Sequence, residues 1–124
     1  MTLRTLLMIL FSVSLSGLAQ VAFKAGVSAP GARAAFASQS PVAMLLAMSL
    51  SPAIVGGLAL YGVGTAVWLA VLSRAPLSTA YPFVGLSFVI TAGLGWWLFH
   101  EPIGPARLAG TALVVAGIVL VARG

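Results

Sequence analysis

The chain has 124 residues, of which 61% are hydrophobic and only 6% are charged, with a net charge of +5. A soluble domain carries about 25% charged residues, so this chain could not cover a water-facing surface with polar groups. The composition excludes a soluble enzyme, and the unbroken apolar runs lack the alternation of a β-barrel strand. The basic residues are spread singly, which is not the pattern of a nucleic-acid-binding protein. We therefore expect an all-α membrane protein.

Four membrane-spanning helices are predicted, each long enough to cross about 30 Å of hydrocarbon at about 1.5 Å per residue. They form a single membrane domain and cover residues 5–25, 53–72, 76–98 and 104–122. Prolines near the starts of the last two helices indicate tight connections between antiparallel neighbours. Residues 26–52 are expected to form a loop, because Pro41 and Pro52 leave the apolar run between them too short to span. That short run is expected to lie in the membrane interface or to extend the second helix.

The first predicted helix also fits a cleavable signal peptide, since Arg4 precedes an apolar run that contains the small residues Gly17 and Ala19. We favour a retained span, because the apolar run continues through residues 21–23. Removal of this segment would also leave the remaining spans with their termini on opposite sides of the membrane.

The basic residues barely distinguish the two sides of the membrane, although such a bias normally sets the orientation. One side receives Arg4, Arg74 and Arg123. The other side receives Lys24, Arg33 and Arg107. If Lys24 is intramembrane, the count weakly favours cytoplasmic termini. The near balance is also typical of a chain that inserts in both orientations and forms an antiparallel homodimer.

A polar stripe follows one face of the first helix, because polar residues recur there at every fourth position. They are Ser12, Ser16, Gln20 and Lys24. Polar side chains at such depth are costly and usually face a cavity or a partner helix. The stripe predicts an anion-binding cavity in which Lys24 meets a phosphate as a point charge. The alternative is that Gln20 and the serines serve helix packing and that Lys24 extends its ammonium to the membrane surface.

Glu101 is the only carboxylate side chain in the chain. Glycosidase-type catalysis, two-carboxylate metal sites and an intramembrane carboxylate relay therefore lack their residues. The chain has no cysteine, which excludes thiolate metal ligands and haem attachment. Glu101 and its neighbour His100 are interpreted as a solvated pair at a helix end. The sequence predicts no enzyme, no metal and no cofactor.

Aromatic residues gather near the predicted helix ends. Tyr81 and Pro82 interrupt the third helix one turn from its start, because proline lacks a backbone donor. Trp68 and Tyr81 face one short connection and are candidates to flank a sugar or lipid headgroup. Trp96 and Trp97 are typical of an aromatic belt at the level of the lipid headgroups.

Small residues are dense in all the predicted helices and permit close packing of helix backbones. On the fourth predicted helix, Gly110, Leu113 and Gly117 share one face, which suits helix pairing within or between subunits. A four-helix bundle is thin, so we expect a dimer whose subunits share the translocation path.

Four segments carry a likeness to a known family: LAQVAFKAG, LSRAPLSTAYPF, WWLFHEPI and GTALVVAGIVLV. They resemble the drug/metabolite transporter superfamily, and in particular the short EamA-like subunits of the flippase for 4-amino-4-deoxy-L-arabinose phosphoundecaprenol. The continuous part of the likeness covers residues 58–121, and the motif at the start of the third helix is its specific part.

The resemblance implies a four-helix subunit that moves a polyprenyl-linked sugar headgroup, or a related anionic lipid headgroup, across the bacterial inner membrane. It implies pairing with a second copy or with a similar short subunit. It also implies that Lys24 and Gln20 belong to the substrate cavity, with Tyr81 and the Arg74 connection near the headgroup.

The small multidrug resistance proteins are more distant relatives in which the first helix carries a glutamate that binds the cation or proton. The first helix of this chain has Lys24 and no acid, which disfavours exchange of a cationic drug for protons. Two alternatives stay open: a transporter of small solutes or drugs, and a non-catalytic subunit of a larger membrane complex.

Overall fold

The computed structural model describes residues 2–124, and this part of the chain is helical without strands. Its helices long and apolar enough to cross a membrane number four: Leu3–Val27, Pro52–Leu72, Leu77–Phe99 and Pro105–Arg123. The first, second and fourth are continuous and are labelled α1, α4 and α7. The third is broken near its start. The all-α architecture with four candidate spans is confirmed.

Polar caps and prolines set where the long helices begin. Thr2 precedes α1, and its hydroxyl accepts a hydrogen bond from the backbone N–H of Thr5 at 3.2 Å. Ser51 precedes α4 and accepts from the N–H of Ile54 at 3.3 Å. Such caps satisfy backbone donors that the first helical turn leaves free.

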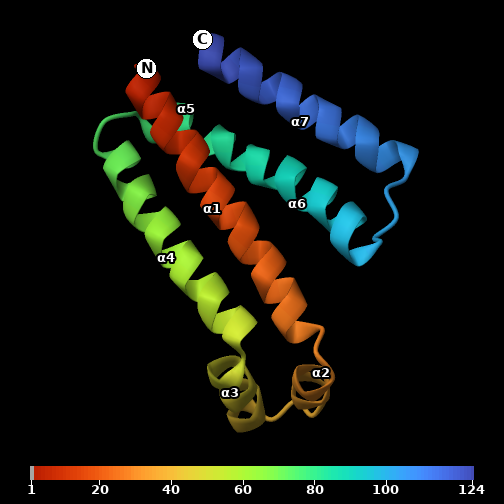
Figure 1. Cartoon of the computed structure of the whole chain (residues 1–124). Helices are drawn as coiled ribbons and strands as arrows, with labels where there is room; N and C mark the ends of the chain where they lie inside the picture. The colour runs from red at the N-terminus through yellow and green to blue at the C-terminus, as the bar shows by residue number, and fades with distance from the viewer. Residues whose placement is uncertain (1) are drawn as a thin grey trace.

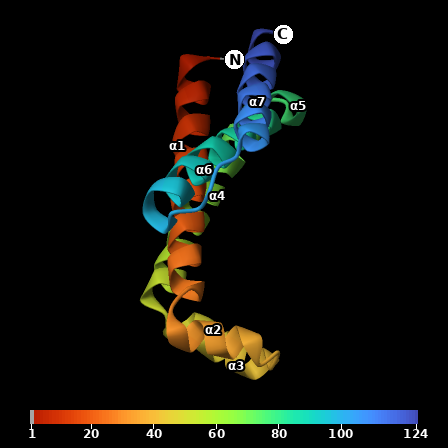
Figure 2. The ribbon, with the colours of Figure 1, turned by 90° about the vertical axis from the view of Figure 1, so that its right-hand side faces the viewer.

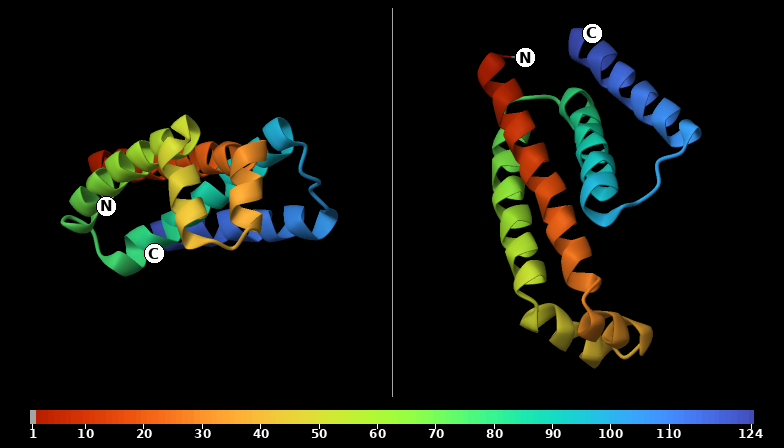
Figure 3. Two further views of the ribbon diagram at one scale, coloured as in Figure 1. Left: turned by 90° about the horizontal axis from the view of Figure 1, so that it is seen from below. Right: turned by 45° about the vertical axis from the view of Figure 1, so that its right-hand side comes forward.

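Helix α1 lies between α4 and α6 (Gly85–Phe99) and packs against both (Figures 1 and 3). Glycines allow these close approaches. A Cβ atom at Gly57 would lie 2.8 Å from the ring of Phe23, and one at Gly17 would lie 3.0 Å from Ile90. Small residues at such crossings let two helix backbones pack closely, and in lipid such packing must replace the hydrophobic driving force that joins helices in water.

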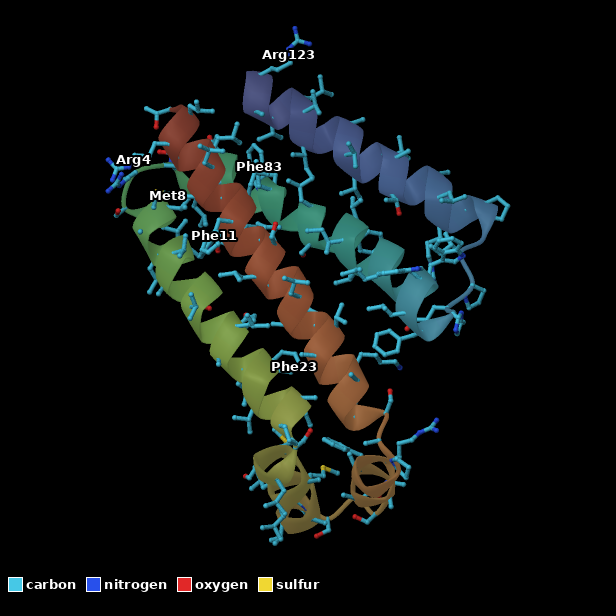
Figure 4. The ribbon with its side chains drawn as sticks, viewed as in Figure 1. Arg4, Met8, Phe11, Phe23, Phe83 and Arg123 are labelled. Carbon is cyan, nitrogen blue, oxygen red and sulfur yellow. The ribbon has the colours of Figure 1, made fainter. Side chains whose placement is uncertain are left out.

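The buried core lies near the end of the bundle that holds both termini (Figure 4). It comprises Ile9, Val13, Val71, Ala80, Phe83 and Ile118. Because these residues come from α1, α4, α7 and the broken third span, this end joins all four spans into one unit.

The third span consists of three pieces: α5 (Leu77–Ala80), a 3₁₀ turn η1 (Tyr81–Val84), and α6. Pro82 is the second residue of the turn. Proline cannot donate the backbone hydrogen bond that a continuous α-helix needs there, and its ring crowds the preceding turn. The predicted interruption at Tyr81 and Pro82 is confirmed.

The expectation of a loop over residues 26–52 is wrong for most of that segment. The chain forms α2 (Pro30–Ala37) and α3 (Pro41–Leu50), which pack against each other and bend away from the ends of α1 and α4 (Figure 2). Pro30 and Pro41 each stand at the start of a helix, where a missing N–H does no harm. The alanine-rich segment after Pro30 is a good helix former, so Pro30 and Gly31 mark the start of a helix and not the predicted loop.

The short apolar helix α3 does not extend α4. The chain turns at Ser51, whose φ of −86° and ψ of 115° are those of extended backbone. The residue before a proline avoids the helical region, so Pro52 separates the two helices while starting the second.

Helix α7 packs on α6 and η1 and leaves most of its surface exposed. Its contact is made by Val114 and Ile118, which a Cβ atom at Gly85 would meet at 2.9 and 3.2 Å. Gly110 and Gly117 have no neighbour within 4 Å of a Cβ position, and Leu113 is 73% exposed. Within residues 2–124, that face of α7 therefore makes no helix pair, and its role between subunits stays a prediction.

Candidate functional site

A cavity lined by both hydroxyl and apolar groups lies between α1, α4 and the broken third span, with a volume of about 170 Å³. We call it the central cavity. Its lining residues are Ser12, Val13, Ser16, Tyr61, Gly64, Thr65, Trp68, Tyr81, Val84 and Ser87. Among the residues singled out from sequence, it brings together Ser12, Ser16, Trp68 and Tyr81.

Trp68 and Tyr81 form an edge-to-face aromatic pair in this cavity. Their ring centroids are 6.5 Å apart and the ring planes meet at 67°, within the range that favours aromatic pairs. Tyr81 is 60% exposed, so one side of the pair is open to a ligand or to lipid. The 3₁₀ turn that begins at Tyr81 holds its ring beside α4.

Ser12 has a structural role. Its hydroxyl donates a hydrogen bond of 2.6 Å to the carbonyl of Gly64 on α4, and its side chain is 4% exposed. A Cβ atom at Gly64 would lie 3.2 Å from the Ser12 carbonyl. The first member of the polar stripe thus joins α1 to α4, and its hydroxyl proton is used within the protein.

Three polar lining residues were not singled out from the sequence: Tyr61, Thr65 and Ser87. Tyr61, Thr65 and Trp68 recur at helical spacing on one face of α4, and this periodicity could have found them. Ser87 follows the 3₁₀ turn, which changes the helical phase. Its place in the cavity could not be predicted without the geometry of that turn.

Lys24 and Gln20 line a second pocket, of about 160 Å³, between α1 and the end of α6. We call it the Lys24 pocket. Its lining residues are Gln20, Val21, Lys24, Thr91, Gly95, Phe99 and Glu101. Ser16 and Lys24 are about 12 Å apart along the helix axis, so the stripe serves two different pockets.

Glu101 turns back from the end of α6 toward α1. Its backbone N–H donates to the carbonyl of Gly95 at 3.2 Å, and its Oε2 would lie 2.7 Å from a Cβ atom at Gly95. Only glycine lets the carboxylate come so close. Glu101, predicted to form a solvated pair with His100 at a helix end, also lies on the wall of the Lys24 pocket.

Arg74 lies at the opposite end of the bundle from Lys24. It lines an open cavity of about 780 Å³ together with Arg4 and Arg123, the residues that the charge count assigned to the same side. Figure 4 shows Arg4 and Arg123 at that end and Phe23 near the other. About 30 Å of helix rise separates Arg4 from Lys24, so one compact headgroup could not contact both Arg74 and Lys24 at once.

Residues 2–124 contain no group of three or more His, Cys, Asp or Glu side chains that could hold an ion. What the geometry offers is hydroxyl groups, aromatic rings and separated charges, which suit the binding of a polar headgroup.

Proteins of known name resemble this chain over nearly its whole length. The chain is 38% identical over 119 residues to a "Probable 4-amino-4-deoxy-L-arabinose-phosphoundecaprenol flippase subunit ArnE" of Pseudomonas savastanoi pv. phaseolicola, an overlap of 96% of this chain and 97% of the relative. It is 34% identical over 122 residues to a protein of the same name from Pseudomonas paraeruginosa, covering 94% and 95% of the two chains.

A relative of the same name from Serratia proteamaculans is 48% identical over 61 residues, which are 49% of this chain and 53% of that protein. No family model matches the chain, and no solved structure matches it. The full-length relatives confirm the resemblance stated from the sequence motifs. The chain therefore belongs to the family of the 4-amino-4-deoxy-L-arabinose-phosphoundecaprenol flippase subunits ArnE.

Proposed function

We propose that this protein is a subunit of a transporter that moves a polyprenyl-phosphate-linked amino sugar across the bacterial inner membrane. The observation that carries the proposal is the similarity, end to end, to relatives named as flippase subunits for such a lipid. The four apolar helices support it, because they provide a membrane path and few groups for covalent chemistry.

Lys24 is the residue proposed to meet the phosphate. It is the only lysine in the chain, its side chain is exposed, and it stands near the end of α1, where a headgroup enters the membrane boundary. A lysine binds phosphate as a point charge without a fixed geometry. Gln20, one turn away on the same face, offers hydrogen bonds to the sugar.

A single copy is proposed to be incomplete. Ligand sites for molecules of drug size occupy about 300–1,000 Å³, whereas the central cavity and the Lys24 pocket are about 170 and 160 Å³. A headgroup therefore needs a wider path, which a partner subunit would supply. The open face of α7 with Gly110, Leu113 and Gly117 is the proposed contact, either with a second copy or with a similar short subunit.

Movement is proposed to involve the break at Tyr81–Val84. In lipid, irregular backbone is tolerated only where protein or a cavity covers it, and this turn borders the central cavity. Rocking of α6 about the turn would expose the cavity to alternate sides while the polyprenyl chain stays in the bilayer. No energy source is visible in the described residues, and we propose that the substrate gradient drives the flipping.

Binding to lipid nanodiscs tests this function. Polyprenyl phosphate, with and without the amino sugar, is titrated into nanodiscs holding wild-type protein, Lys24→Ala or Arg33→Ala. Arg33 lies on α2, outside both pockets, so its variant controls for the loss of one positive charge. We expect saturable binding by wild type and by Arg33→Ala, and at least about tenfold weaker binding by Lys24→Ala. Equal binding by both variants would overturn the role of Lys24, and no binding by folded wild type would overturn the proposed substrate.

A further inference from the structure

We infer that the Lys24 pocket is a zwitterion site, in which Lys24 binds a phosphate and Glu101 binds a primary ammonium on the same ligand. This inference rests on the proposed function and specifies which feature of the headgroup is selected. It follows from the presence of two opposite side-chain charges, Lys24 and Glu101, on the wall of this pocket.

The two charges come from distant parts of the sequence. Lys24 stands in the last turn of α1, and Glu101 follows the left-handed residue His100 (φ 55°), which ends α6. That conformation reverses the chain direction, so that Glu101 returns against the helix it has just left. Since Lys24 is the only lysine and Glu101 the only acidic residue, the fold brings together two residue types that each occur once.

Glu101 is held in place by contacts other than an ion pair. Its carboxylate packs on Gly95, and its backbone N–H bonds to the Gly95 carbonyl at 3.2 Å. No salt bridge, meaning N to O within 4.0 Å, joins Glu101 to Lys24 in residues 2–124. Both charges therefore remain available to a ligand that spans the gap between them.

A ligand with both charges suits this arrangement better than one with a single charge. Near the membrane the effective dielectric constant is low, and a charge without a partner is costly. A ligand with only a phosphate would satisfy Lys24 and leave its own negative charge facing Glu101. A ligand that carries an ammonium beside the phosphate satisfies both groups and removes the repulsion.

Two kinds of lipid carry both a phosphate and a primary ammonium: a polyprenyl phosphate linked to an aminated sugar, and a phospholipid with an ethanolamine headgroup. Thr91 and Gln20 on the pocket wall supply neutral hydrogen-bonding groups, which a sugar could use and ethanolamine could not. We therefore expect the aminated sugar to bind more tightly than phosphatidylethanolamine.

The experiment uses nanodiscs of phosphatidylglycerol, which carries no amine. Wild-type protein is titrated with the amino-sugar phosphopolyprenol and with the same lipid after N-acetylation, which removes the positive charge. We expect the free amine to bind at least about tenfold more tightly than the acetylated lipid, as a charge-assisted hydrogen bond predicts. Glu101→Gln should lower this ratio to near one and leave the affinity for the acetylated lipid unchanged or improved.

Lys24→Gln separates phosphate binding from ammonium binding, since it should weaken the binding of both lipids by a similar factor. Gly95→Ala and Gly93→Ala form a matched pair: a Cβ atom at Gly95 meets the Glu101 carboxylate at 2.7 Å, whereas one at Gly93 meets nothing within 4 Å. Only the Gly95 variant should reduce the preference for the amine. Because neither change alters charge, this comparison tests the placement of Glu101 even if Glu101→Gln fails to fold.

The outcomes distinguish the inference from the proposed function. Equal binding of the free and acetylated lipids by wild type would overturn the zwitterion site and leave the flippase proposal standing. Failure of folded wild type to bind either lipid would overturn both. Competition by phosphatidylethanolamine as strong as that of the amino-sugar lipid would support the pairing of charges and assign the site to a bilayer lipid.

Discussion

Replacing Gly57 with alanine tests whether the close contact between α1 and α4 holds the bundle together. The new Cβ atom would lie 2.8 Å from two carbons of the Phe23 ring and 3.1 Å from the carbonyl oxygen of Ala19. Normal carbon contacts are about 3.5–4.0 Å, so the ring would have to shift by about 0.7 Å or more. The backbone oxygen cannot move away unless α1 itself moves.

The matched control is Gly56→Ala, one residue away on the same helix, where a Cβ atom meets nothing within 4 Å. Both variants gain about 1 kcal/mol or less from the better helix propensity of alanine. Only Gly57→Ala suffers overpacking, which costs about 1–3 kcal/mol. We therefore expect Gly57→Ala to be less stable than Gly56→Ala by about 1–3 kcal/mol.

The free energies of unfolding are measured in mixed micelles by titration with SDS, with loss of helicity as the signal. Equal stability of the two variants would refute the reasoning, because it would mean that α1 and α4 do not approach as closely as described. A loss of stability in both variants would show that alanine disturbs α4 by itself, and it would refute the assignment of the effect to the contact with Phe23.

Three further predictions concern individual residues. Ser12→Ala removes the hydrogen bond to α4 and should lower the free energy of unfolding by about 0.5–1.5 kcal/mol in the same SDS titration. Substrate binding should stay intact. Unchanged stability would contradict the structural role of Ser12. Trp68→Leu should reduce transport at unchanged expression, whereas Tyr81→Phe should keep the aromatic pair and most of the activity in proteoliposomes. Gly117→Leu, on the open face of α7, should lower the yield of cross-linked dimer without loss of monomer helicity, and an unchanged yield would place the subunit contact elsewhere.

The spans could be predicted because few backbone structures can cross a lipid bilayer. Length, hydropathy and isolated charges mark a helix that must satisfy all its backbone groups internally. The break at Pro82 could also be predicted, because the missing backbone N–H of proline disrupts a helix at that position in any environment. Helix α2 was missed for the opposite reason: Pro30 and Gly31 signal a loop or a helix start, and only the packing of α2 against α3 decides between them.

The spacing of the polar stripe on α1 does not predict which helix each of its residues faces. Its regular spacing places Ser12 and Lys24 on one side of α1, but each step of four residues drifts by about 40° around the axis. Over the length of α1, the drift carries the stripe from α4 toward α6, so its members face different partners. Glu101 could not be assigned to the Lys24 pocket from sequence, because the left-handed turn at His100 brings together segments far apart in the chain.

The central claim, that the protein carries an amino-sugar lipid across the membrane, is tested most directly in proteoliposomes. The lipid is placed in the inner leaflet, and its free amine is labelled by a reagent that cannot cross the bilayer. We predict that labelling rises with time for wild-type protein and for Arg33→Ala, and stays at the level of protein-free liposomes for Lys24→Ala. Labelling that is the same for wild type and for protein-free liposomes, with the folded protein and its partner subunit both present, would contradict the account.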